Sequence, residues 1–170
     1  MKAIKSILLG SLVLAGTLGA SSSFATQWFV GGSANGTSTV GPGPTNVTFA
    51  GNNFPCTSTF TVQDVGGAAS VIAASFSGSA VCKAIKATNL PWAISAPARG
   101  SSGGNPTWTA TVSDVSVAAL GFFTCSGSVA INVIGTNPTP TATNAHITGS
   151  LGVCGVSSGD LSTNPIITGT

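Results

Sequence analysis

The side chains that could support acid–base chemistry are few and widely spaced. The sequence contains one histidine, His146, three aspartates and no glutamate. A Ser-His-Asp triad would need His146 beside a serine and an aspartate. Paired carboxylates would have to come from Asp64, Asp114 and Asp160, which lie in separate, turn-like segments. We therefore predict no catalytic residues and no enzyme activity, and we interpret His146 as an exposed or rim residue on a strand.

The remaining residues with distinctive chemistry are four cysteines: Cys56, Cys82, Cys125 and Cys154. A metal site made of all four is disfavoured because no C-x-x-C spacing occurs, so we expect no metal and no cofactor. In an exported chain, two disulfides are the simpler interpretation, with three possible connectivities. Turn-forming residues lie midway between the first two cysteines and midway between the last two, so each pair would close a hairpin. We therefore predict the bonds Cys56–Cys82 and Cys125–Cys154.

The two segments bracketed by cysteines resemble each other. When they are aligned on their first cysteines, Phe60 falls on Val129 and Val62 falls on Ile131, so the apolar residues keep the same period of two. This pattern indicates an internal duplication.

The first residues are typical of an export signal. Lys2 and Lys5 precede an apolar run over residues 7–18, and a small-x-small cleavage site ends at Ala25. The run is too short for a membrane anchor and is interrupted by glycine, so we expect no transmembrane segment in the mature chain. The predicted location is therefore secreted, either extracellular or at the cell surface, with residues 1–25 removed.

Charge is sparse beyond that signal. Lys83, Lys86 and Arg99 oppose the three aspartates, which leaves a net charge near zero. Nucleic-acid binding is disfavoured because it needs a basic stripe to neutralise phosphates. A near-neutral surface offers little electrostatic resistance to association. The expected partners are therefore further copies of the same chain, a hydrophobic surface or the cell envelope.

The pattern of apolar residues predicts an all-β fold. Short runs rich in β-branched and aromatic residues are separated by Gly, Pro and Asn, and no stretch keeps a helical period. We predict an antiparallel sandwich or barrel-like domain built on two disulfide-stapled hairpins. Residues 83–86 should continue the return strand of the first hairpin as an exposed edge, and residues 115–123 should be extended.

A third hairpin is expected between residues 93–96 and residues 107–112, joined by a long Gly-rich loop. Trp92 and Trp108 are then placed in the core beneath it. The alternative for the two indoles is a sugar-stacking platform, although no polar residues cluster around them.

The predicted organisation is a signal peptide (residues 1–25), a flexible N-terminal arm (26–45) and one all-β domain (46–170), with repeat units at about 55–96 and 124–168. The arm begins with the apolar residues Trp28, Phe29 and Val30 and continues with Gly, Ser and Thr. Two interpretations are open. These three residues form the first strand of their own domain, or they are an assembly strand that adds to the sheet of a neighbouring subunit.

Four short motifs resemble a known family: Pro55-Cys56-Thr57, Phe60-Thr61-Val62, Phe76-Ser77-Gly78-Ser79 before Cys82, and Asn89-Leu90-Pro91-Trp92. Together they are similar to the small secreted bacterial activators of alkane oxidation of the PraA/PraB type. The resemblance runs from about residue 55 to residue 92, with a fainter echo between the last two cysteines. It implies a non-catalytic extracellular protein that helps cells use hydrophobic substrates such as alkanes, as a surface-active or cell-surface component.

The same sequence supports an alternative function. An N-terminal assembly strand, near-zero net charge and strands rich in Ser, Thr and Gly are also typical of a structural subunit of an extracellular fibre or biofilm matrix. The oligomeric state of the mature chain distinguishes the two hypotheses.

Overall fold

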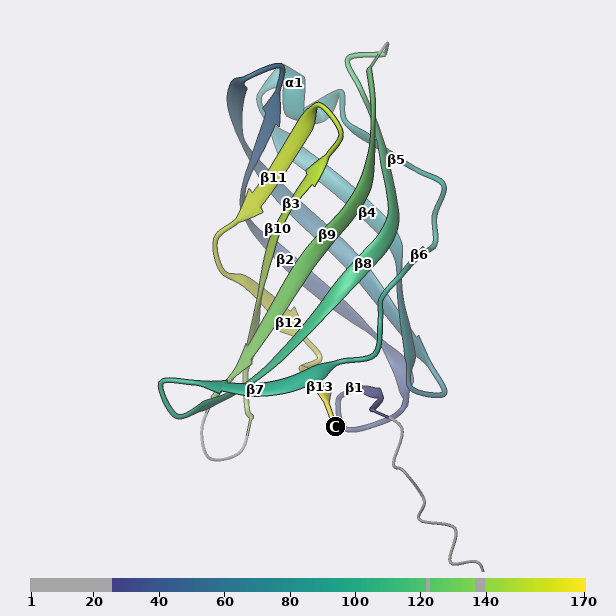
Figure 1. Cartoon of the computed structure of the whole chain (residues 1–170), viewed down its shortest axis with the longest axis vertical. Helices are drawn as coiled ribbons and strands as arrows, with labels where there is room; N and C mark the ends of the chain where they lie inside the picture. The colour runs from purple at the N-terminus through teal and green to yellow at the C-terminus, as the bar shows by residue number, and fades with distance from the viewer. Residues whose placement is uncertain (1–25, 122, 137–139) are drawn as a thin grey trace, which may run out of the picture.

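The computed structural model describes residues 26–121, 123–136 and 140–170, and the predicted signal peptide lies outside these residues (Figure 1). Most of the described chain is strand, and every strand pair is antiparallel, which confirms the predicted all-β fold. The elements in chain order are β1 (Trp28–Val30), β2 (Asn35–Phe49), β3 (Asn52–Val65), β4 (Ala68–Gly78), α1 (Ala80–Lys83), β5 (Lys86–Thr88), β6 (Trp92–Ala93), β7 (Ala98–Ser102), β8 (Asn105–Ala119), β9 (Phe123–Gly135), β10 (Thr143–Leu151), β11 (Cys154–Ser158), β12 (Leu161–Asn164) and β13 (Ile167–Gly169).

The main sheet has eleven strands and curls until its two ends meet. Its path runs β5-β8-β9-β10-β11-β2-β3-β4-β6. Directly after β6, Ile94 bridges to Val112 of β8, and the N–H of Ser95 donates to the backbone oxygen of Thr111 at 2.9 Å. Because β6 also pairs with β4, this short segment connects the two ends of the path. The result is a closed, barrel-like sheet, with β8, β9 and β10 on the near wall and β2, β3 and β4 on the far wall (Figure 1).

The long strands alternate between the interior and the solvent, as a period of two requires. In β2, Thr45, Val47 and Phe49 are buried, whereas Asn46 between them is exposed. Nearly half of the buried core residues are valine or isoleucine, which are β-branched and suit a pleated surface. The two tryptophans of the predicted third hairpin belong to this core, with 2 % of Trp92 and 3 % of Trp108 exposed, so neither is a sugar-stacking platform.

The first cysteine-bracketed segment folds as predicted around its midpoint. β3 and β4 pair from Cys56↔Gly78 to Val65↔Ala68, and Gly66 and Gly67 form the turn with φ values of 63° and 84°. A positive φ at both turn residues matches the twist of the flanking strands and favours glycine. In the second segment, β9 pairs with β10, and the expected turn residues 137–139 lie outside the described part of the chain.

The prediction of a flexible arm over residues 26–45 is wrong for its second half. Residues 35–45 belong to β2, which pairs with β3 over most of its length. The Gly41–Pro44 stretch suggested a linker, but the sheet accommodates it as an irregularity, with a register shift between Val40 and Gly43. Proline is tolerated in strands at such bulges because no ladder hydrogen bond is lost there.

The third hairpin also differs from the expectation. β7 pairs with β8 through a tight turn at Gly103 and Gly104, rather than across a long loop. Residues 93–95 instead occupy the space between β4 and β8, where their backbone closes the sheet. The long Gly-rich segment was predicted as a loop, but most of it is strand.

Residues 83–86 do not continue the return strand. Ser79 caps a short helix, α1, and its hydroxyl accepts a hydrogen bond from the N–H of Cys82 at 3.3 Å. Lys86 then begins β5, which lies at one end of the sheet path and pairs with β8. The predicted extended segment from residue 115 is strand as far as Ala119, where a turn at Leu120 and Gly121 begins.

Candidate functional site

The one histidine sits on β10, half-buried, beside a single carboxylate. His146 Nε2 lies 2.8 Å from Asp160 Oδ1, and 34 % of the His146 side chain is exposed, as expected for a rim residue. Within the described residues, no serine hydroxyl is hydrogen-bonded to the imidazole. The pair therefore lacks the nucleophile that a triad needs.

The other two aspartates lie elsewhere, so the structure brings no pair of carboxylates together. Asp114 is exposed at a register shift of β8 and has a φ of 57°. Asp64 was expected in a turn, but it lies on β3 and only 1 % of it is exposed. Among the described residues, no group of three or more His, Cys, Asp or Glu side chains could hold a metal ion.

Asp64 is the ionisable side chain whose burial the sequence did not indicate. Neither of its carboxylate oxygens has a hydrogen-bond partner of normal geometry. Burial raises the pKa of the Asp64 carboxyl, and the backbone amide of Gly67 opposes only part of that increase. A buried carboxyl with so little hydrogen bonding favours its neutral form, and Asp64 has no second carboxylate with which to share a proton.

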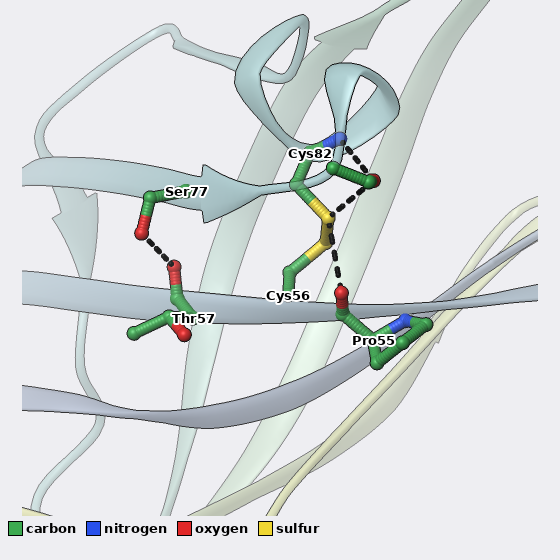
Figure 2. The surroundings of a disulfide bond; sticks show 6 residues. Pro55, Cys56, Thr57, Ser77 and Cys82 are labelled. Carbon is green, nitrogen blue, oxygen red and sulfur yellow. Dashed lines mark hydrogen bonds between the residues drawn. A yellow bond between two sulfur atoms is a disulfide. The ribbon is translucent and has the colours of Figure 1, made fainter.

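The two disulfides join the pairs of cysteines that the spacing predicts. Cys56 on β3 is bonded to Cys82 in α1, and their Cα atoms are 5.6 Å apart (Figure 2). Cys125 on β9 is bonded to Cys154, the first residue of β11, with a Cα–Cα distance of 5.8 Å. In each case the second cysteine lies just past the return strand rather than on it, because α1 or the turn before β11 intervenes.

Both disulfides lie at the same end of the closed sheet. α1 and the β10–β11 turn are found at that end, and β1 and β13 are found at the opposite end (Figure 1). We call the end that carries α1 and the β10–β11 turn the stapled end. Ser77 Oγ also donates to the backbone oxygen of Thr57 at 3.4 Å, beside the Cys56–Cys82 bond (Figure 2).

The stapled end carries most of the large apolar side chains that remain exposed. Val153 in the β10–β11 turn is 71 % exposed, Phe123 at the start of β9 is 39 % exposed, and Leu120 in the turn before it is 37 % exposed. We call these three residues the apolar tip. The Cys125–Cys154 bond ties the two turns together, because Val153 directly precedes Cys154 and Phe123 lies two residues before Cys125.

The proposed assembly strand is placed against its own chain. β1 pairs with β13 in a separate two-stranded sheet, with Trp28 opposite Gly169 and Val30 opposite Ile167. Trp28 and Val30 are buried, whereas Phe29 between them is half-buried.

A family model described as alkane oxidation protein activator PraA/PraB-like matches residues 1–170, the whole chain. The chain belongs to this family. Neither a curated protein nor a solved structure matches the chain. The name of the PraA/PraB-like family describes an activator rather than an oxidising enzyme, which is consistent with the catalytically poor surroundings of His146.

Two further features of this PraA/PraB-like protein bear on its location. Its two disulfides are compatible with an extracellular protein. In the part of the chain that the structure describes, no helix has the length and apolar character needed to cross a membrane.

Proposed function

We propose that this PraA/PraB-like protein is secreted and promotes contact between bacteria and hydrophobic substrates such as alkanes, as a non-catalytic surface-active or cell-surface protein. The export signal in the sequence and the family description support this proposal. The observation that carries it is the apolar tip, which holds exposed Val, Leu and Phe side chains on a disulfide-bonded end.

Transfer from water to a hydrocarbon surface would stabilise the apolar tip. Complete burial of a Val, Leu or Phe side chain is worth about 1.5–3 kcal/mol, and each side chain of the tip contributes the part of that value set by its exposed fraction. Few charges oppose the transfer, because the chain beyond residue 25 has three cations and three aspartates.

The backbone at Leu120 supports a role for the exposed side chain. Leu120 has a φ of 55°, a left-handed conformation that costs a leucine about 1–2 kcal/mol. Asparagine or glycine would occupy this turn position with less strain. An exposed leucine here therefore lowers stability, and contact with an apolar surface offers a reason to keep it.

The test compares adsorption of purified mature protein at a hexadecane–water interface, measured as the fall in interfacial tension. Leu120→Asn and Val153→Ser should each slow adsorption, and Leu120→Asn should also raise the free energy of unfolding. Val65→Ser is the matched control, because Val65 is 62 % exposed as the last residue of β3, beside the β3–β4 turn at the opposite end of the sheet. Equal adsorption by all variants would contradict the role of the apolar tip.

A growth experiment tests the biological side of the proposal. Bacteria that carry or lack the gene are compared for growth on long alkanes and for emulsification of the culture. Growth and emulsification should both fall when the gene is removed. No difference in either measurement would contradict the proposed function.

A second candidate function is a subunit of an extracellular fibre or biofilm matrix. The observation that favours it is that β1 and β13 form a sheet of their own. β1 is only three residues long, and β13 is its one strand partner among the described residues, although the N–H of Trp28 also donates to the backbone oxygen of Gly67. The equivalent strand of a neighbouring subunit could replace it with the same register. Electron microscopy of secreted material tests this: filaments that disappear when residues 26–34 are deleted would support it, and a strictly monomeric protein would contradict it.

A further inference from the structure

The interior of the closed sheet contains a cavity of about 90 Å³. All of its lining residues are apolar, and they come from both walls and from both ends of the sheet. Lining residues from the walls include Val62, Val112 and Val133, and those from the ends include Trp28 and Ile85.

The cavity follows from the choice of core residues. Valine supplies ten of the lining side chains, and alanine supplies two, Ala69 and Ala145. A closed sheet of about eight strands has an interior that side chains can just fill, or that can hold one small ligand. Small side chains projecting from opposite walls leave the centre of this interior unfilled.

No lining group offers a free hydrogen bond to an occupant. The two indole N–H groups are used by the backbone: Trp28 Nε1 donates to Ser95 O at 2.8 Å, and Trp92 Nε1 donates to Thr88 O at 2.9 Å. A buried water needs two to four polar partners, so the cavity does not suit water. A ligand with a hydroxyl or carboxyl group would lose its own hydrogen bonds to solvent on entering.

We infer that this interior cavity is a binding site for a small molecule without hydrogen-bonding groups, that is, a short saturated hydrocarbon. Apolar cavities of about 150 Å³ bind benzene or xenon, and the smaller volume here selects a slimmer ligand. The inference goes beyond the proposed function, because it concerns the interior of the sheet and needs no contact through the apolar tip.

The test uses xenon and propane as probes of the mature, disulfide-bonded protein. Methyl NMR spectra are recorded at increasing gas pressure. Methyl groups of lining residues such as Val133 and Ile147 should shift and reach saturation, whereas those of the exposed Val65 and Val153 should not. Shifts that are linear in pressure, or equal at all four residues, would overturn the inference.

Variants that fill the cavity give the second arm of the test. Ala145→Ile adds three carbons to a lining residue and should weaken binding of both probes about tenfold or more. Ala130→Ile is the matched control, since Ala130 is exposed on the outer face of the neighbouring strand β9, and it should bind as the wild type does. If Ala145→Ile does not fold, Val133→Ile fills the same cavity with a single added carbon and should weaken binding less. Undiminished binding in a folded filling variant would overturn the inference.

Adsorption at the hexadecane–water interface separates this inference from the proposed function. Ala145→Ile leaves the exposed surface unchanged and should adsorb normally while losing the probes. A wild-type protein that adsorbs but never shows saturable shifts would overturn the cavity site alone. One that binds the probes but does not adsorb would contradict the proposed function alone.

Discussion

The indole Nε1 of Trp28 donates a 2.8 Å hydrogen bond to the backbone oxygen of Ser95. Ser95 belongs to the segment that connects β6 to β8 and so closes the main sheet. The first strand of the chain is thereby attached to the point where the two ends of that sheet meet. This relationship places the N-terminal apolar segment inside the fold of its own chain.

Replacement of Trp28 by alanine should therefore destabilise the whole domain. Only 1 % of Trp28 is exposed, and a buried Trp→Ala change costs about 3–5 kcal/mol. Phe29→Ala is the matched control on the same strand; because Phe29 is only half-buried, its loss should be clearly smaller. Urea unfolding of both variants measures the difference, and equal small losses would show that β1 is a loosely attached arm.

Asp64 should make the protein less stable as the pH rises. Burial raises the pKa of the Asp64 carboxyl above its ordinary value of 3.8, so the folded state binds this proton more tightly than the unfolded chain does. This contribution is complete below pH 3.8 and is lost as the pH rises through the folded-state pKa, with a slope of up to about 1.4 kcal/mol per pH unit.

Asp64→Asn removes the ionisation while nearly keeping the shape of the side chain. This variant should show a higher free energy of unfolding at neutral pH and a flatter profile as the pH rises above the ordinary carboxyl pKa of 3.8. Asp114→Asn is the control, because Asp114 is exposed and its left-handed φ of 57° suits asparagine. A profile for Asp64→Asn that parallels the wild type would refute this account of the buried carboxyl.

Each disulfide should contribute a similar amount to stability. The bonds span 26 and 29 residues, and in the chain-entropy model loops of this size are each worth about 3.5 kcal/mol. The double variants Cys56→Ser with Cys82→Ser, and Cys125→Ser with Cys154→Ser, should therefore lower the unfolding free energy about equally. Thermal unfolding of the two variants side by side checks this, and a loss confined to one pair would contradict it.

Gly43 should not tolerate a side chain, although its backbone conformation is ordinary. A Cβ atom there would lie 2.5 Å from Leu161 Cδ2 and 2.8 Å from the backbone oxygen of Asp160, where β12 packs against β2. Gly43→Ala should cost about 1–3 kcal/mol through overpacking. The control is Gly155→Ala, whose Cβ would meet Thr48 at an ordinary 3.6 Å. Denaturant midpoints of the two variants should differ clearly, and matching midpoints would contradict the packing argument.

The hairpins and their staples were predictable because their signals are local. Alternating apolar residues and turn-forming glycines predicted the β3–β4 hairpin. The spacing of the cysteines around the midpoint turn predicted the Cys56–Cys82 bond. Trp92 and Trp108 were expected in the core beneath a third hairpin, and both are buried, although that hairpin forms between β7 and β8 instead.

Features that depend on distant segments could not be predicted in the same way. Gly41–Pro44 has the composition of a linker, and only the pairing of Gly43 and Pro44 with β3 makes it part of a strand. Asp64 lies in a stretch of sequence typical of a turn, and its burial depends on how β3 lies within the closed sheet. The cavity likewise arises where small side chains from opposite walls meet, which no single stretch of sequence records.

The pairing of β1 with β13 brings the described ends of the chain together. The N–H of Thr170 donates to the backbone oxygen of Gln27 at 3.1 Å, and the N–H of Gln27 donates to Thr170 Oγ1 at 3.3 Å. A short linker can therefore join residue 170 to residue 27, and new ends can be opened at the exposed turn around Gly51. Such a circular permutant would keep every strand pair of the sheet while moving both free ends to the side where the disulfides lie.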